Sequence, residues 1–288
     1  MLNEEAAQEK APNAKSIPWE KVPWWVIILV ALGAFLTYLI MANPNYHDTF
    51  NYLKAGVVMT LRITFTAYIF AVSAGLLIGL ARTSKNKIIY TLATLYVEVV
   101  RGIPMVVLML YVAFALVPAA VGVIKSFGGW GLAHFQNAIL RDVFTALSHA
   151  STRDLPMNVR AIIALAMGYA AFEAEVFRAG IQSIGRGQME AALSLGMNYF
   201  QAMRFVILPQ AVRRVLPPLG NDFVALLKDS SLATVLAVRE ITQMGRLRRA
   251  STFRVMETFN VVAYLYLSMT LLLSGMVRYL EQRLKIKE

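Results

Sequence analysis

The amino-acid sequence predicts an all-α, polytopic membrane protein with about six transmembrane helices. Of the 288 residues, 58% are hydrophobic. The mean hydropathy of +0.56 is too high for an ordinary soluble domain. Windows of about 20 mainly apolar residues, the length that a helix needs to cross a bilayer, recur along the chain. These two observations place the chain in a membrane.

The expected spans are joined by polar segments. Residues 1–21 are charged and contain prolines, which predicts a tail. The apolar run that follows is longer than the core of a signal peptide and has an acidic start, which predicts a retained anchor. The spans are expected at about 22–42, 53–81, 88–124, 159–181, 211–236 and 257–278, with a short loop at 43–52 and a tail at 281–288.

The third span is expected to be kinked or broken. The run from Ile88 to Ile124 is too long for one straight span, and it contains Gly102 and Pro104. Proline removes a helical hydrogen bond and disfavours helix in the residue before it. The following segment, residues 125–158, is interpreted as a long polar insertion outside the membrane.

Basic residues predict which side of the membrane each end occupies. An even number of spans puts both termini on one side, together with the basic residues Arg82, Lys85 and Lys87 and the segment 178–214. The positive-inside rule makes that side cytoplasmic. One expected outer loop, residues 245–254, opposes the rule, since it contains Arg246, Arg248, Arg249 and Arg254.

Composition disfavours several other classes of protein. The net charge of +11 is better explained by cytoplasmic loops than by nucleic-acid binding, because lysine and arginine mark such loops in membrane proteins. The chain has no cysteine, which excludes disulfides and thiolate chemistry. The three histidines, His47, His134 and His149, lack the spacing of metal ligands, so no metal site is expected.

Charged side chains lie within two expected spans. Span three contains Glu98 and Arg101, and span four contains Glu173, Glu175 and Arg178. Charges at membrane depth are costly and usually pair or face water. They either form structural ion pairs near the span ends or line a solute pathway, where they would suit the ammonium and carboxylate of a zwitterion. A catalytic pair of carboxylates is conceivable, but no nucleophile or metal set accompanies it.

A polar interruption occurs at residues 226–235, where Lys228, Asp229, Ser230 and Ser231 stand in apolar surroundings. Irregular backbone is not tolerated against lipid, so this stretch is either an unwound piece of helix that faces a cavity or a helix end at the interface.

The segment EAALSLGMNYFQAMRFVILPQ, residues 190–210, is too polar to span a membrane and too apolar for a free loop. Gly196 predicts two short helices rather than one. The helical spacing of Leu193, Met197, Phe200 and Met203 indicates an apolar face. Such a segment either lies on the membrane surface or docks in the groove of another protein.

The same segment resembles the signature of permease subunits of ABC importers, namely EAA, three residues, Gly, nine residues, an aliphatic residue, any residue and Leu-Pro. Flanking sequences, including YVEVVRGIP and FEAEVFRAGIQSIGRGQMEAA, are similar to the polar amino-acid uptake branch, and the resemblance covers about residues 53–280. The signature positions are Glu190, Ala191, Ala192, Gly196, Val206, Leu208 and Pro209.

The resemblance implies a five-span permease core at 53–280, with an additional span and outer loop at 22–52. It also implies a bacterial inner-membrane protein with both termini cytoplasmic. Residues 185–210 would be a coupling segment that sits in a cleft of a cytoplasmic ABC ATPase dimer. The contacts would come from Glu190, Ala191, Ala192, Gly196, Leu208 and Pro209.

Further partners follow from the resemblance: a second permease subunit, identical or similar, and an extracytoplasmic solute-binding protein. This chain lacks G-x-x-x-x-G-K-[ST], so ATP and Mg are expected on the partner ATPase and no cofactor on this chain.

The predicted function is therefore a transport subunit rather than an enzyme: the permease of an ATP-driven importer of polar amino acids that works by alternating access. Two alternatives are an ion-coupled secondary transporter, with the same acids as relay residues, and a membrane enzyme that uses Glu98, Glu173 and Glu175. Neither needs the segment at 190–210. The charge of the substrate stays open, because outer arginines favour acidic solutes whereas carboxylates within the spans favour cationic ones.

Overall fold

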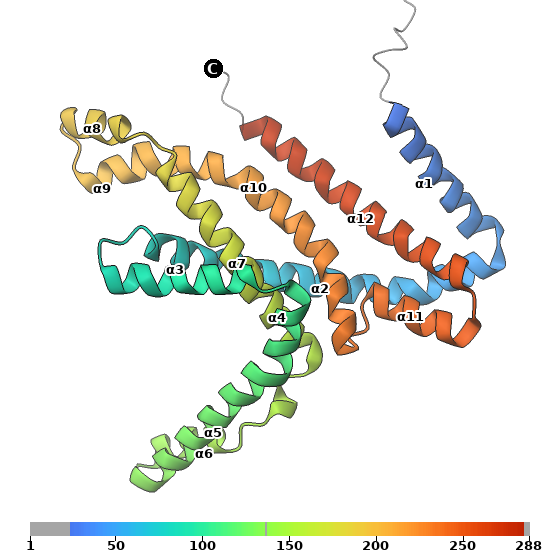
Figure 1. The fold of residues 1–288 in the computed structure, drawn as a ribbon, viewed down its shortest axis with the longest axis horizontal. Helices are drawn as coiled ribbons and strands as arrows, with labels where there is room; N and C mark the ends of the chain where they lie inside the picture. The colour runs from blue at the N-terminus through green and yellow to red at the C-terminus, as the bar shows by residue number, and fades with distance from the viewer. Residues whose placement is uncertain (1–23, 136, 285–288) are drawn as a thin grey trace, which may run out of the picture.

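The computed structural model describes residues 24–135 and 137–284. Within these ranges the chain is helical and contains no β-strand, as the sequence predicts. The expected tail at 1–21 and residues 285–288 of the expected C-terminal tail lie outside the described residues. Figure 1 shows a bundle of long helices, an arm that projects from it, and two short helices at one tip.

The first two helices follow each other almost without a loop. Helix α1 (Trp24–Ala42) is followed by Asn43, which caps helix α2 (Pro44–Ala81) by accepting a 2.9 Å hydrogen bond from Asn45 N. The loop predicted at 43–52 is therefore wrong. Asparagine at the cap and proline in the first turn are favourable helix-start residues, which explains the helical polar stretch. With 38 residues, α2 is about 57 Å long and exceeds the bilayer core of roughly 30 Å.

The break predicted in the third span is confirmed. Helix α3 (Lys87–Gly102) ends before the extended residues Ile103 and Pro104, and a second helical run then extends from 105 to 134. This run consists of α4 (Met105–Tyr111), the π-helical turn η2 (Val112–Leu116) and α5 (Val117–His134).

The expected polar insertion at 125–158 is a helical hairpin instead. Helix α6 (Ala138–Ser148) packs back along α5 to form the arm in Figure 1. Glycines permit this close approach: a Cβ at Gly128 would lie 2.3 Å from Ser148 N, and one at Gly131 would collide with the Phe144 ring. The apolar helix therefore does not end near residue 125, where the insertion was expected to begin, but continues to His134.

A buried arginine fixes the base of this arm. Arg160, near the start of α7 (Met157–Gln182), donates hydrogen bonds to the carbonyl oxygens of Leu155 at 2.7 Å and Ala113 at 2.9 Å. A further bond reaches the carbonyl oxygen of Thr152, in the short 3-10 turn η3 (Thr152–Asp154). Three carbonyl acceptors offset the cost of burying the guanidinium. The start of α7 is thereby tied to the π-helical turn.

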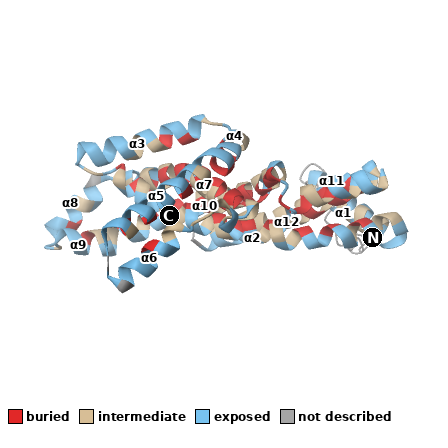
Figure 2. Cartoon of the chain, turned by 90° about the horizontal axis from the view of Figure 1, so that it is seen from below, coloured by how far each residue is buried: buried red, intermediate tan, exposed pale blue. Residues whose placement is uncertain are grey.

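The centre of the bundle is the contact between α2 and α7, with α10 (Leu208–Asp229) and α12 (Val255–Leu284) packed around it. A Cβ at Gly75 would lie 2.5 Å from the Cβ of Glu173, and one at Gly79 would lie 2.8 Å from Ala174 O. Missing side chains thus let the two helices approach closely. Figure 2 shows buried residues concentrated where α7, α10 and α2 meet.

The predicted basic loop at 245–254 is also wrong. Helix α10 ends at Asp229, the chain continues as the 3-10 turn η5 (Ser230–Leu236), and α11 (Ile241–Thr252) follows. Glu240 caps α11, because its carboxylate accepts bonds from Thr242 N and Gln243 N, both at 2.7 Å. A good cap and a buried inner face make this basic stretch helical.

Four helical stretches of the described chain are long and apolar enough to cross a membrane: 24–42, 44–81, 105–134 and 255–283. Helices α7 and α10, which the sequence predicts as spans, are not among them. Both pack against α2 within the bundle, so a charged face on them need not meet lipid. Crossing by all six predicted spans therefore stays a prediction.

The α2–α7 contact predicts the effect of filling Gly75. We expect Gly75→Ala to lower the stability of the purified protein in detergent by about 1–3 kcal/mol, since the new methyl group meets Glu173 and the α7 backbone. Thermal unfolding measures this change. Gly122→Ala, in a helix with open space around the site, is the control and should be neutral or stabilising. Equal stability of both variants would contradict the importance of this contact.

Candidate functional site

Two short helices form a tip beyond the ends of α7 and α10 (Figure 1). Helix α8 (Arg186–Ser194) and helix α9 (Tyr199–Ala202) are separated by Gly196, whose φ of +82° lies in the left-handed region. Glycine reaches this conformation without steric cost. Asn198 then caps α9 in a reciprocal pair of 2.9 Å bonds with Gln201. The prediction of two short helices around Gly196 is confirmed.

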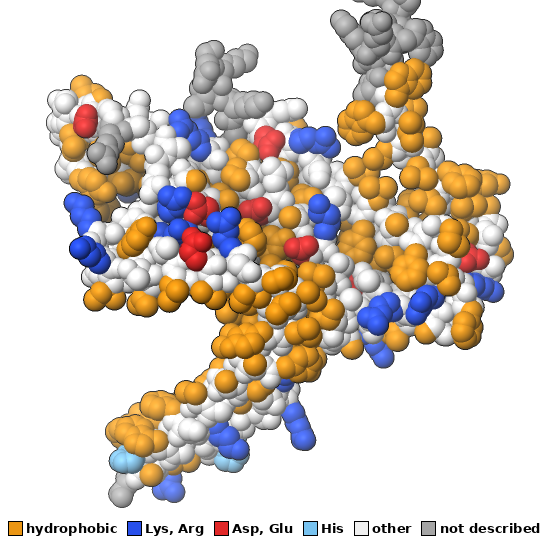
Figure 3. Space-filling view, viewed as in Figure 1, with side chains coloured by type: hydrophobic (Ala, Val, Ile, Leu, Met, Phe, Trp, Pro, Cys, Tyr) orange, Lys and Arg blue, Asp and Glu red, His pale blue; other side chains and the backbone are white. Residues whose placement is uncertain are grey.

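The tip exposes apolar side chains to its surroundings. Leu195 is 81% and Phe200 is 82% exposed, and Leu193 and Tyr199 are also exposed. Hydrophobic side chains gather at this tip in Figure 3. Met203 instead packs inward, so the single apolar face predicted for this segment is divided between an outer and an inner surface. An exposed apolar patch of this kind marks a contact surface.

The predicted coupling residues fall on both surfaces. Within α8, Glu190 and Ala191 face outward, whereas Ala192 is buried. Leu208 and Pro209 are exposed at the start of α10.

The tip is joined firmly to both long helices. Ile184, Ile207 and Ala211 form a small buried cluster beneath α8, and Met203 packs on it. Arg214 of α10 donates a hydrogen bond to the carbonyl oxygen of Ser183, at the end of α7. A force applied to the tip therefore reaches α7 and α10 together.

A cluster of ion pairs joins three helix ends near this tip. Arg82, at the end of α2, lies 2.6 Å from Glu175 of α7 and 3.7 Å from Glu98 of α3. Glu175 also pairs with Arg178, which in turn bonds Gln182. Glu175 is thus shared by two arginines.

Arg82 was expected only in a cytoplasmic loop, and its role in this cluster was missed. The one sequence signal was its place directly after the apolar run of span two. Glu98 and Arg101 share a helix but do not pair. The Arg101 guanidinium lies 5.4 Å from the ring centroid of Phe172 instead.

Glu173 stands apart from these ion pairs. It is fully buried in α7, and its carboxylate oxygens have no hydrogen-bond partner among the described residues. Asp222 of α10 and Tyr68 of α2 lie close enough to interact with it electrostatically. A buried carboxyl group without a partner is costly, which makes Glu173 a candidate site residue.

The polar stretch after α10 is turned inward. Tyr169 donates a 2.9 Å hydrogen bond to the Asp229 carboxylate, which ties α7 to the end of α10. Ser230 is buried and donates to Leu227 O at 2.7 Å, whereas Lys228 is exposed and shares the lining of a small pocket with Ser231. Helix α10 ends at Asp229, within the predicted polar interruption. The chain then continues as the 3-10 turn η5, in which Ser230 is buried. The predicted pathway residues therefore separate into an ion-pair cluster, one isolated acid and this helix end.

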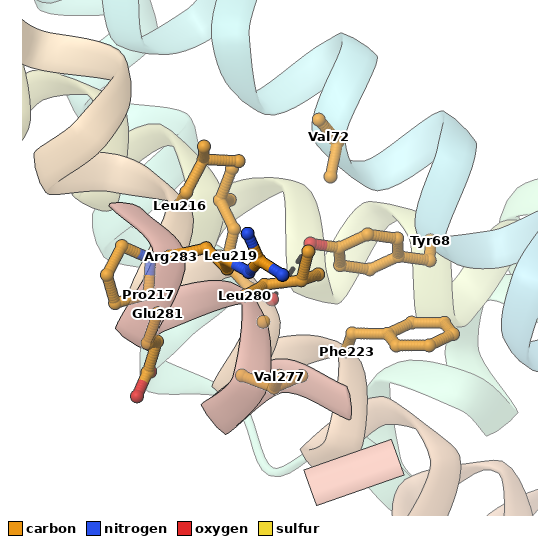
Figure 4. A pocket seen from close by; sticks show the side chains of 11 residues that line it. Tyr68, Val72, Leu216, Pro217, Leu219, Phe223, Val277, Leu280, Glu281 and Arg283 are labelled. Carbon is orange, nitrogen blue, oxygen red and sulfur yellow. Dashed lines mark hydrogen bonds between the residues drawn. The ribbon is translucent and has the colours of Figure 1, made fainter. Parts of the chain in front are cut away.

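An apolar cavity of about 590 Å³ lies between α2, α10 and α12. Figure 4 shows Tyr68 and Phe223 at one side of it and Glu281 and Arg283 at the other. The Tyr68 hydroxyl is engaged, because it donates to Leu219 O at 2.8 Å. The lining of this cavity suits a hydrocarbon chain rather than a zwitterion.

Residues 71–286 match the family described as the inner membrane component of binding-protein-dependent transport systems. The chain belongs to this family. The matched region of the permease begins within α2 and includes the tip formed by α8 and α9, whereas α1 and the start of α2 precede it. The resemblance to ABC importer permeases is confirmed.

Similar proteins cover most of the permease. The glutamine transport system permease protein of Escherichia coli (strain K12) is 37% identical over 234 residues, which are 81% of this chain and 93% of that protein. The nopaline transport system permease protein of Agrobacterium fabrum (strain C58 / ATCC 33970) is 31% identical over 234 residues, covering 81% and 88%.

Solved structures agree in fold. A chain in a crystal structure of an amino acid ABC transporter with histidines is 33% identical, with a TM-score of 0.64, and covers 81% of the permease and 94% of that chain. An inward-facing methionine ABC transporter is 19% identical with a TM-score of 0.61, covers 82% and 97%, and shows the fold alone.

The ion-pair cluster predicts different effects for its two glutamates. Glu175→Gln should reduce amino-acid uptake more than it reduces the amount of folded permease, because it removes the charge shared by Arg82 and Arg178 while keeping the side-chain size. The stability loss should stay at about 1 kcal/mol or less, as the carboxylate is partly exposed. Uptake and permease content are measured in the same cells. Glu98→Gln, at a side chain 68% exposed, is the control. Equal losses of uptake and protein would instead assign Glu175 to structure alone.

Proposed function

We propose that this permease is the transmembrane subunit of an ATP-driven ABC importer for polar amino acids. The observation that carries the proposal is the coupling tip: an exposed apolar surface at the EAA position, built on a left-handed glycine and fixed to two long helices. The relatives that transport glutamine and nopaline support an amino-acid substrate.

The proposed energy source is a cytoplasmic ABC ATPase dimer that binds ATP and Mg, with no cofactor on this chain. Its cleft would receive α8 and α9, with Glu190 at the contact. Motion of the ATPase would move the tip, and the buried cluster around Ile207 would pass this motion to α7 and α10. Since Glu175 is shared by Arg82 and Arg178, the ion-pair cluster would hold the cytoplasmic ends of α2 and α7 together and tie them to α3 while the ATPase is at rest.

The proposed solute pathway passes Glu173 rather than the ion pairs. Glu98, Glu175 and Arg178 already have partners within the chain. The isolated Glu173 carboxyl group, with Asp222 nearby, would meet the ammonium group that every amino acid carries, and the arrival of that cation would favour the charged form of the carboxyl group.

The proposed assembly has two permease subunits, identical or similar, and a solute-binding protein on the outer side. In the inner membrane both termini would be cytoplasmic. The described ends of α1 and α12 point to the same side in Figure 1, and the turns α1–α2 and α11–α12 lie together at the opposite end of the bundle, in support of this orientation.

Reconstitution tests the proposal. The permease, purified with candidate ABC ATPases and placed in proteoliposomes, should take up an amino acid only with internal ATP and an external solute-binding protein. Uptake that persists without ATP but follows an ion gradient would favour a secondary transporter. Failure of every ATPase to form a stable complex would also contradict the proposal.

Charge reversal at the tip tests the coupling role. Glu190→Lys should abolish binding of the ATPase, measured by co-purification, and leave the permease folded and inserted, because Glu190 is exposed and has no ion pair within the described chain. Asp142→Lys, an equal charge change at an exposed position in the arm, is the control and should co-purify normally. Intact ATP hydrolysis stimulated by the substrate-loaded binding protein in Glu190→Lys would overturn the assignment.

A further inference from the structure

The C-terminal half of α11 exposes arginines for which the described residues supply no carboxylate. Arg246 and Arg249 are exposed and share one side of the helix at positions i and i+3, and Phe253 is the first residue after the helix. Arg239 is exposed just before the helix, and Arg254 is half-buried just after it. None of these arginines forms an ion pair in the part of the chain that the structure describes.

The helix that carries this basic face is held rigidly. A Cβ at Gly56 would lie 2.8 Å from Ile241 N, and one at Gly245 would lie 2.7 Å from the Val262 side chain, so α11 is wedged against α2 and α12. The Arg248 guanidinium lies 5.5 Å from the ring centroid of Tyr52. These contacts fix the helix backbone that carries Arg246 and Arg249 before any partner arrives, which lowers the cost of ordering this surface on binding.

Phe253 adds an aromatic side chain at the end of the same helix. It is 86% exposed, and its φ of +57° puts a bulky residue in the left-handed conformation where a helix end normally has glycine. A strained residue that also exposes a large apolar ring to solvent points to a function. Arginine and aromatic residues are the side chains that most often dominate the affinity of protein interfaces.

The position of this face favours water over lipid. From Gly56 to Tyr52, α11 runs along α2 towards the α2 N-terminus, and that end carries the polar residues Asn45, His47 and Asp48. Since α2 is about 57 Å long, its polar first turns extend past a bilayer core of roughly 30 Å. Helix α11, which Phe253 follows directly, lies at the far end of the bundle from α8 and α9 (Figure 1).

We propose that Arg246, Arg249 and Phe253, flanked by Arg239 and Arg254, form the docking surface for an acidic face of the solute-binding protein. The inference rests on the proposed function and its orientation. Opposite charges would steer the loaded binding protein onto the permease, and Phe253 would fix its position. Docking of the binding protein also explains why residues 245–254 carry four arginines on the outer side, where the positive-inside rule predicts few.

The test uses the permease assembled with its ATPase in nanodiscs. The probe is a purified, amino-acid-loaded binding protein that stimulates ATP hydrolysis by the wild-type assembly. If no binding protein stimulates it, the proposed function fails and the docking surface is not at issue. If one does, Arg246→Glu with Arg249→Glu should raise the half-maximal concentration of binding protein about tenfold or more. Rising ionic strength should raise it in the wild type.

Two controls separate docking from folding. Arg141→Glu with Arg153→Glu makes the same charge change at exposed arginines outside this surface and should leave the half-maximal concentration unchanged. Phe253→Gly should maintain or increase the thermal stability, because glycine fits the left-handed position, and yet weaken docking about fivefold.

Three results would overturn the docking surface. The first is an unchanged half-maximal concentration in both the double-glutamate variant and Phe253→Gly. The second is a wild-type assembly that is insensitive to salt. The third is an effect seen in nanodiscs with phosphatidylglycerol but not in phosphatidylcholine alone, which would assign the surface to anionic lipid.

Discussion

The close contact between α2 and α7 is the constraint on which the rest of the permease depends. At Gly75 and Gly79 the two helices approach so closely that any side chain would meet the α7 backbone or Cβ atoms. This approach fixes the relative position of the helices along their length, and it therefore brings Arg82 of α2 to Glu175 of α7. It also encloses Glu173, whose carboxylate is left without a hydrogen-bond partner in the described chain. The same close packing thus creates both the ion-pair cluster and the isolated acid.

Sequence reasoning predicted features that depend on local rules. Gly196 and Pro104 predicted a turn and a break because their backbone preferences act within a few residues. Structural ion pairs were one of the two alternatives for the charged residues of span four, and the structure pairs Glu175 with Arg178 at i, i+3 spacing. The pairing of Arg82 with Glu175 was missed, since it joins residues 93 positions apart and depends on how α2 packs on α7. Spacing alone suggested a partner for Glu98 on its own helix, but the structure places that partner on α2.

Polar composition misled the sequence reasoning at three places. Polar residues predicted loops at 43–52 and 245–254 and a polar insertion at 125–158, yet each of these segments contains helix. Asn43 is a favourable cap residue, and the side chains of Asn43 and Glu240 both accept backbone hydrogen bonds at the helix starts. In the arm, glycines that suggested a loop instead allow α5 and α6 to pack closely. Capping residues therefore carried more information here than the average polarity of the segment.

The contacts of the permease form a continuous route between its two ends. At the end proposed to face outward, α11 is wedged against α2 at Gly56; in the middle, α2 is packed on α7 at Gly75; at the other end, α7 leads into the coupling tip. At Gly56 and Gly75 the helices approach each other at the level of backbone and Cβ atoms. Such close packing transmits a displacement from one helix to the next, because protein interiors have low compressibility. A binding protein that pressed on α11 and an ATPase that held α8 would therefore act on the same pair of helices. Glu173 lies within that pair, so the acid proposed to meet the substrate sits where both displacements converge.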